Sequence, residues 1–265
     1  MQPYPEWLHI LAWLSLAAGF LRCFRQSATT YNPSMGKHLL LLSSSRVHGG
    51  GYLDHAENEI RGFLKGVSRV LFVPYALQDR EGYAAVARQK FEAMGFALDS
   101  IHEAGDPKEA VAQTEAMFVG GGNTFRLLNT LYYYELLPWI RERAKSGMRY
   151  LGASAGSNLA GPTIKTTNDM PIVQPPSFEA LGLVPFQINP HYIDADPNTT
   201  HMGETREQRL REYLEENEVP VVAIREPAMI HVEQSVITLE GKGGGTIFRR
   251  GVAPFQIESG SLIEL

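Results

Sequence analysis

The chain has 265 residues, of which 44% are hydrophobic, and its formal net charge at pH 7 is −5. This is ordinary globular composition, long enough for one large domain with a buried core. Lysines and arginines are scattered, so we expect no nucleic-acid partner, which would require a basic stripe. The single cysteine, Cys23, excludes a disulfide framework and a zinc ribbon, and it suits a reducing compartment, here taken as the cytoplasm.

Residues 1–35 are expected to form an N-terminal extension outside the fold. An apolar stretch from Trp7 to Phe24 is about long enough to span a membrane. However, the residues before it include Glu6 and no lysine or arginine, unlike a secretory signal. A signal or anchor and an organelle-targeting segment stay open. We favour a dispensable tail, and we expect no stable membrane partner unless this stretch is an anchor.

From residue 36 onward, short apolar runs alternate with helical patterns. Strands are expected at residues 38–42, 70–73, 96–101, 116–119 and 149–153. Helices are expected between them at residues 54–64, 80–94, 107–113, 125–131 and 136–146. This alternation is typical of a mostly parallel sheet with helices on both faces.

The last third of the chain has a different pattern. A strand-like run at residues 186–188 and a helix at 205–216 precede several short strands joined by glycine-rich turns. These strands are expected at residues 221–224, 229–232, 236–239, 246–249 and 255–258. We predict a single α/β domain over residues 36–265, with antiparallel strands at the C-terminal edge of its sheet.

Residues 152–156 read Gly-Ala-Ser-Ala-Gly, the G-x-S-x-G pattern of a nucleophile elbow. An apolar strand precedes Ser154 and a helix-compatible run follows it, which is the context that this pattern requires. Small flanking residues let strand and helix approach, and the turn exposes the hydroxyl at a helix N-terminus, where negative charge is favoured. We predict Ser154 as a nucleophile; the alternative is an ordinary turn capped by serine.

A glycine loop at residues 119–124, Val-Gly-Gly-Gly-Asn-Thr, follows a strand and opens a helix. It lacks the Lys-Ser/Thr ending of a P-loop, and Phe125 replaces the last glycine of G-x-G-x-x-G, so a phosphate site is not expected. Glycine N–H groups at a strand end can instead point at a developing oxyanion. We predict that Gly122 and Ala155 supply them, although a tight turn that needs positive φ is the alternative.

A serine nucleophile needs a general base that a carboxylate orients. His191 is the candidate, because it follows a strand on a loop at the sheet's C-terminal edge, where open parallel sheets bind ligands. The carboxylate is left open between Asp169, which lies between Ser154 and His191 in the chain, and Glu226, which lies just beyond a strand.

A metal site in one loop is the rival interpretation of the same region. The loop has no H-E-x-x-H spacing, and solvated loops are often rich in such residues, so we predict no metal. The possible ligands are His191, Asp194, Asp196, His201 and Glu204.

Several ordered motifs together resemble the peptidase E family, the α-aspartyl dipeptidases, over the chain from about Lys37 to the C-terminus. The motifs are the elbow, the glycine loop, and residues 166–173, 187–191 and 203–209. The resemblance implies a fold like that of class I glutamine amidotransferases. It also implies hydrolysis of small Asp-Xaa dipeptides by an acyl-enzyme, without metal or cofactor.

The resemblance also implies roles for individual residues. Ser154 would be the nucleophile and His191 the base, and both Asp169 and Glu226 remain candidates for the carboxylate that orients it. Arg206 would bind the substrate's aspartyl side chain, because a guanidinium offers paired donors to a carboxylate. Asn123, in the glycine loop, is predicted as a second substrate-binding residue.

Two other functions stay open at this point. A cyanophycinase-like exopeptidase would cleave β-aspartyl linkages with the same triad but a different specificity pocket. A non-catalytic, amidotransferase-like binding domain would keep the elbow as a feature of the fold. The sequence does not distinguish a monomer from a homodimer.

Overall fold

The computed structural model describes residues 36–198, 200 and 202–265. The apolar stretch from Trp7 to Phe24, and with it the choice among anchor, targeting segment and tail, lies outside the described residues. Within the described ranges, no helix has the length and apolar character needed to cross a membrane.

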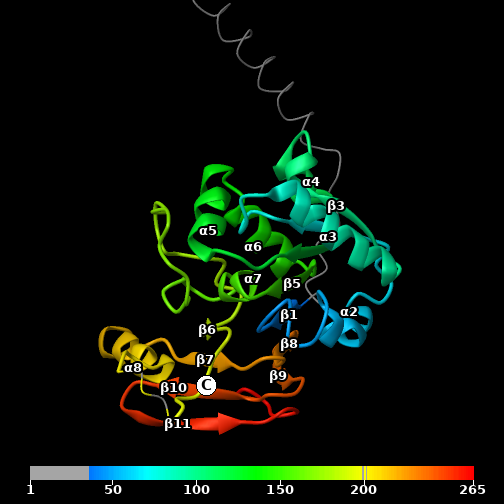
Figure 1. The fold of residues 1–265 in the computed structure, drawn as a ribbon. Coiled ribbons are helices and arrows are strands. Elements are labelled where there is room, and N and C mark those ends of the chain that lie inside the picture. The colour runs from blue at the N-terminus through cyan, green and yellow to red at the C-terminus, as the bar shows by residue number, and fades with distance from the viewer. Residues whose placement is uncertain (1–35, 199, 201) are drawn as a thin grey trace, which may run out of the picture. The chain divides into compact units, whose positions relative to one another are not determined.

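A seven-stranded sheet forms the centre of the fold (Figure 1). The order is β3-β2-β4-β5-β1-β8-β9; neighbouring strands are parallel from β3 to β1, and β8 and β9 pair antiparallel. This confirms the predicted parallel sheet with antiparallel strands at its C-terminal edge. The strands are β1 (His38–Leu42), β2 (Arg69–Val73), β3 (Ala97–Ser100), β4 (Ala116–Val119), β5 (Arg149–Ala153), β8 (Met229–Glu233) and β9 (Val236–Glu240).

Helices cover both faces of this sheet (Figure 1). Strand β1 shows why: Leu39 and Leu41 pack with α4, α5 and α6, whereas Leu40 and Leu42 pack with α2 and α3. A run of leucines buried on both sides is what a parallel sheet between two helical layers requires. The helices are α2 (Glu57–Phe63), α3 (Arg80–Ala93), α4 (Pro107–Gln113), α5 (Thr124–Tyr133) and α6 (Leu137–Lys145), with short 3-10 turns η1 (Asp54–Ala56) and η2 (Ile101–Glu103).

Local signals set the helix ends close to where the sequence predicts them. Helix α3 begins after Asp79, whose carboxylate accepts the N–H of Gly82, and it ends just before Gly95, which has φ +87°. Helix α4 begins after Asp106, which accepts the N–H groups of Lys108 and Glu109.

A second sheet of four strands, in the order β11-β10-β7-β6, corrects the expectation that all C-terminal strands extend the main sheet. One side of it, with Ile188 and Val222, joins the main core, and helix α8 packs Leu210 and Leu214 on the other side. The strands at residues 221–224 and 245–249 are buried on both faces because they lie between that core and α8. The elements are β6 (Gln187–Asn189), α8 (Arg206–Glu216), β7 (Val221–Ile224), β10 (Gly245–Arg249) and β11 (Val252–Ile257).

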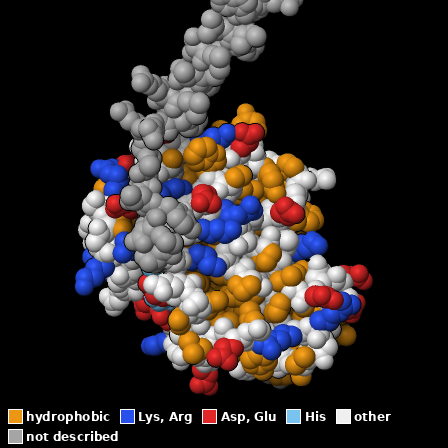
Figure 2. All heavy atoms as spheres, turned by 180° about the vertical axis from the view of Figure 1, so that it is seen from behind, with side chains coloured by type: hydrophobic (Ala, Val, Ile, Leu, Met, Phe, Trp, Pro, Cys, Tyr) orange, Lys and Arg blue, Asp and Glu red, His pale blue; other side chains and the backbone are white. Residues whose placement is uncertain are grey.

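Charged side chains of both signs are scattered among hydrophobic ones on the face shown in Figure 2.

Candidate active site

The carboxyl ends of three neighbouring parallel strands bring the predicted motifs together. Strand β1 lies between β5 and β8, and β5 also pairs with β4, with Leu42 opposite Ala153 and Val119 opposite Gly152. The glycine loop after β4 and the serine after β5 therefore emerge side by side. The N–H of Ser154 donates to the carbonyl of Leu42 at 3.0 Å, which fixes this turn to β1.

Ser154 occupies a tight turn between β5 and helix α7 (Ala155–Asn158), with φ +52° and ψ −108°. A positive φ is costly for a residue with a side chain and is often found at functional sites. A Cβ at Gly152 would lie 2.7 Å from the backbone of Gly156, and one at Gly156 would lie 2.1 Å from the carbonyl oxygen of Val119. Both glycines of the elbow are thus required by close backbone contacts.

Replacing Gly156 with alanine is expected to lower the free energy of unfolding by about 3 kcal/mol, because backbone atoms must move to admit the methyl group. The matched control is Gly62→Ala in helix α2, where an added Cβ meets nothing within 4 Å. That control is expected to gain about 0.5–1 kcal/mol from reduced chain entropy. Urea unfolding of both variants measures the difference, and equal stability would contradict the close contact at the elbow.

A hydrogen-bonded series joins serine, histidine and glutamate. The Oγ atom of Ser154 lies 2.6 Å from Nε2 of His191, and Nδ1 of His191 is hydrogen-bonded to Oε1 of Glu226. A carboxylate only accepts hydrogen bonds, so Nδ1 carries the proton and Nε2 is left to accept from the serine hydroxyl. The geometry is that of a nucleophile, a base and an orienting carboxylate.

His191 is held in place by a buried serine that the sequence analysis did not single out. The backbone N–H of His191 donates to Oγ of Ser43 at 2.9 Å, and the hydroxyl of Ser43 donates to the carbonyl of Ile224 at 2.9 Å. Ser43 directly follows β1 at the carboxyl edge of the sheet, and that position was the signal available in the sequence. His191 itself has φ +54°.

Asp169, the other candidate carboxylate, has different partners. Its Oδ2 atom accepts the N–H of Thr124 at 2.8 Å and the hydroxyls of Thr124 and Thr167 at 2.6 and 3.1 Å. The structure therefore places Glu226, and not Asp169, on His191. Asp169 nevertheless lines the same pocket as Ser154 and His191.

The predicted oxyanion donors lie beside the serine. Gly122 has φ +131°, and a Cβ there would lie 2.7 Å from the carbonyl oxygen of Ala76, so the loop needs glycine. Across residues 36–198, 200 and 202–265, the N–H groups of Gly122 and Ala155 have no hydrogen-bond partner in the protein. Two N–H groups are thus free to bind an oxyanion.

The two predicted substrate-binding residues have different surroundings. Arg206 is the first residue of α8; burial and the neighbouring Arg209 lower its pKa, while Asp169 acts in the opposite direction. Arg206 and Asp169 are therefore electrostatic neighbours. The amide oxygen of Asn123 accepts the N–H of Arg126 at 3.0 Å and caps helix α5, and its NH₂ group donates at 2.8 Å to the carbonyl of Met170, in the segment between α7 and β6.

The pocket over Ser154 has a volume of about 610 Å³. Its lining includes Arg46, Tyr52 and Tyr83, none of which the sequence analysis identified. Burial raises the pKa of both tyrosines, whereas the nearby Arg46 lowers it. Isolated residues on different elements leave no motif, so no sequence signal was available for them.

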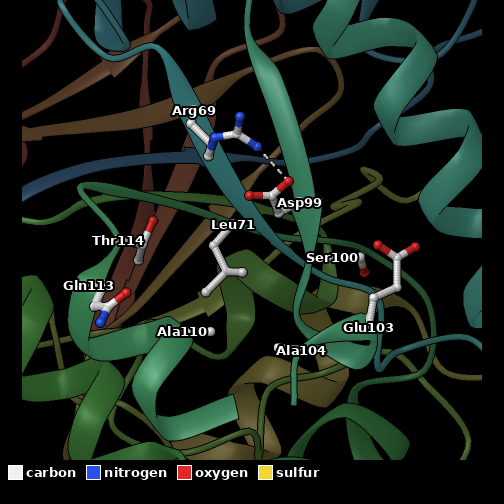
Figure 3. Close-up of a pocket in the computed structure, with 9 residues that line it drawn as sticks. All are labelled: Arg69, Leu71, Asp99, Ser100, Glu103, Ala104, Ala110, Gln113 and Thr114. Carbon is white, nitrogen blue, oxygen red and sulfur yellow. Dashed lines mark hydrogen bonds and ion pairs between the residues drawn. The ribbon is translucent and has the colours of Figure 1, made fainter. Parts of the chain in front are cut away.

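A second serine, Ser100, also contacts a histidine. Its Oγ lies 2.6 Å from Nδ1 of His102, and Nε2 of His102 lies 3.1 Å from Glu81. Ser100 ends strand β3 with ordinary extended φ and ψ and is 2% exposed. It lines a different pocket, in which Arg69 and Asp99 point toward each other (Figure 3). Ser100 thus has neither the elbow nor the glycine loop of Ser154.

Possible metal ligands gather elsewhere. Among the described residues, the one group close enough to hold an ion is Glu81, His102 and Glu103, none of which lines the pocket over Ser154. In the loop that carried the rival metal interpretation, Asp194 forms a bidentate pair with Arg225 at 2.6 Å, and His201 lies outside the described residues.

The model of the family described as Peptidase family S51 matches residues 39–240. The chain belongs to this family. It is 52% identical to a peptidase E of Streptomyces coelicolor over 224 residues, which are 84% of this chain and 92% of the relative. It is 46% identical over 216 residues to a Drosophila melanogaster protein described as "Probable alpha-aspartyl dipeptidase", covering 80% and 90% of the two chains.

The solved structure of a peptidase from an acI-B1 Actinobacterium matches with a TM-score of 0.66 at 18% identity, over 89% of this chain and 99% of that chain, which supports the fold alone. Family membership confirms the resemblance inferred from the motifs. The S51 chain is a serine-type dipeptidase.

Proposed function

We propose that this S51 peptidase hydrolyses dipeptides whose first residue is aspartate, through an acyl-enzyme on Ser154. The observation that carries the proposal is the series Ser154–His191–Glu226, set beside two free N–H groups on the carboxyl edge of the sheet. The names of the relatives from Streptomyces coelicolor and Drosophila melanogaster support the substrate class.

Recognition of an N-terminal aspartate needs an anion for the α-ammonium and a cation for the side-chain carboxylate. Asp169 lines the pocket, and its Oδ1 is not used by the threonines that bind Oδ2, so we assign it to the ammonium group. Arg206 is partly buried near Asp169, and no hydrogen bond within the described ranges engages its guanidinium, so we assign it to the aspartyl carboxylate. In this assignment, Asp169 and Arg206 are oppositely charged neighbours that match the two charges of the substrate's first residue.

In the acylation step, Nε2 of His191 takes the proton of Ser154 as Oγ attacks the scissile carbonyl carbon. The N–H groups of Gly122 and Ala155 bind the resulting oxyanion, while Glu226 stabilises the imidazolium. The carbon–nitrogen bond then breaks, and His191 gives its proton to the departing amine.

Deacylation repeats these steps with water. His191 takes a proton from the water molecule that attacks the acyl-enzyme, the ester bond breaks, and the proton returns to Oγ of Ser154. The products are free aspartate and the second amino acid. The molecule that the protein binds is therefore a small dipeptide. We place the reaction in the cytoplasm, because a chain with one cysteine suits a reducing compartment.

Substrate specificity is tested with Asp-Leu, Asn-Leu and β-linked Asp-Leu, in the presence of EDTA, on the wild type and Arg206→Met. We expect the wild type to prefer Asp-Leu, and the variant to lose about 100-fold in kcat/KM for it, because a charge-assisted pair with a partly buried guanidinium is lost. The matched control is Arg209→Met on the same helix, an exposed arginine beside Glu204 that should keep wild-type kcat/KM.

The other results of this assay point to the alternatives. Preferential cleavage of the β-linked dipeptide would favour the cyanophycinase-like exopeptidase. Cleavage of none of the three would favour a binding domain or another substrate. Activity that EDTA abolishes would contradict a mechanism that uses only protein groups.

A further inference from the structure

Arg46 is the single lysine or arginine among the described residues that line the pocket over Ser154. It lies on the loop after β1, and Ser43 at the start of that loop accepts the backbone N–H of His191 at 2.9 Å. The loop therefore runs past the catalytic histidine. Ser44 fixes the backbone of Arg46, because its Oγ accepts the Arg46 N–H at 3.1 Å and donates to the Arg46 carbonyl.

A series of contacts links the Arg46 side chain to the nucleophile. The guanidinium carbon lies 5.8 Å from the ring centroid of Tyr52, which meets Tyr83 edge-on with a centroid separation of 6.2 Å. Tyr83 in turn lies against the glycine loop, because a Cβ on Gly120 would lie 2.4 Å from its phenol oxygen. A Cβ on Gly121 would lie 3.1 Å from that of Ser154. The two tyrosines thus connect the guanidinium to the glycine loop beside Ser154, and all of these residues line one pocket.

The guanidinium of Arg46 has no hydrogen-bonded or ion-paired partner in the part of the chain that the structure describes. Arginines that line other pockets do have such partners. Arg69 donates to Asp99 at 2.6 Å (Figure 3), and Arg225 pairs with Asp194 in a separate pocket beside His191. Asp79 and Asp169, the two carboxylates that line the Ser154 pocket, form no ion pair with Arg46: Asp79 accepts the N–H of Gly82, and Oδ2 of Asp169 accepts from threonines. Arg46 is therefore available to an anion that enters with the substrate.

The chemistry of the reaction identifies that anion. The departing amine must lie at Nε2 of His191, from which it takes its proton. In a dipeptide, the departing residue carries a free carboxylate one carbon away from that nitrogen. We propose that Arg46 binds this C-terminal carboxylate, and that this contact restricts the enzyme to dipeptides. This proposal rests on the proposed function, and it identifies Arg46 as part of the binding site for the second residue of the dipeptide, which leaves as the amine.

The test compares Asp-Leu with its C-terminal amide, which lacks only the charge, on the wild type, Arg46→Gln and Arg46→Lys. We expect the wild type to prefer the free acid by about 10- to 100-fold in kcat/KM, as a charge-assisted hydrogen bond predicts. Arg46→Gln should lose this preference by slowing Asp-Leu alone, and Arg46→Lys should keep part of it. Arg80→Gln is the matched control, since Arg80 also lies over a tyrosine, Tyr75, at 4.9 Å but does not line the pocket.

The proposal is overturned if Arg46→Gln keeps the preference of the wild type, or slows the acid and the amide equally. Binding provides a second measurement that does not depend on turnover. Calorimetry on Ser154→Ala should show Asp-Leu binding about 10-fold more weakly once Arg46→Gln is added, and an unchanged Kd would also overturn the proposal. Absence of hydrolysis in the wild type would count against the proposed function, and calorimetry would still decide the role of Arg46.

Discussion

Ser154→Ala is expected to lower kcat for Asp-Leu by about 10⁴-fold or more, because the nucleophile of a serine–histidine–carboxylate series is lost. The variant should fold normally, since among the described residues the hydroxyl of Ser154 is hydrogen-bonded to His191 alone, and its backbone N–H still donates to Leu42. Steady-state kinetics and thermal unfolding measure the two effects. A fluorophosphonate probe should label the wild type and not the variant.

The neighbouring Ser157 provides a control with the opposite pattern. Its buried hydroxyl donates to the carbonyls of Leu42 at 2.6 Å and Gly152 at 3.0 Å, so Ser157→Ala should lose about 1–2 kcal/mol of stability and keep most of its activity. If Ser154→Ala retained more than about 1% of wild-type kcat, the acyl-enzyme mechanism on this residue would be wrong.

Glu226→Gln is expected to lower kcat by about 10³- to 10⁴-fold with little change in KM. The amide is the same shape as the carboxylate, but its NH₂ group can donate to Nδ1 and place the histidine proton on the wrong nitrogen. Asp169→Asn, in contrast, should raise KM for Asp-Leu by about 10-fold or more, because a carboxylate assigned to the substrate ammonium becomes neutral. Full kinetic curves for both variants separate kcat from KM.

The reverse pattern would exchange the two roles. A loss of kcat in Asp169→Asn with near-normal turnover in Glu226→Gln would mean that His191 changes partner when substrate binds. Thermal unfolding of Asp169→Asn is needed beside the kinetics, because Thr124 and Thr167 also depend on this carboxylate.

Motifs that depend on local sterics were predictable from the sequence. The elbow needs small residues beside Ser154, and the structure shows the reason in the contacts of Gly152 and Gly156. The glycine loop was predicted at the end of a strand, and the structure brings it beside Ser154 because that strand, β4, pairs in parallel with β5. The leucine run of β1 likewise indicated a strand buried on both sides.

Features that depend on distant pairing were not predictable. The choice between Asp169 and Glu226 depends on β7 lying beside β6, which places residue 226 close to residue 191, and no spacing in the chain encodes that pairing. The second sheet escaped prediction for the same reason. Arg46 escaped because a single arginine in a loop has no pattern, and only the fold brings Tyr52 and Tyr83 beside it.

The nucleophile and its base come from different sheets. Ser154 follows a strand of the main sheet, whereas His191 and Glu226 follow the adjacent strands β6 and β7 of the second one. The imidazole and its carboxylate are therefore positioned by one sheet, and contacts between the two sheets, such as those of Ser43 with His191 and Ile224, help to set the distance from Oγ to Nε2. The catalytic groups are thus in position for reaction only when the two sheets of the chain are packed together correctly. A substitution at the contact between the two sheets is therefore expected to lower kcat even though every catalytic side chain is retained.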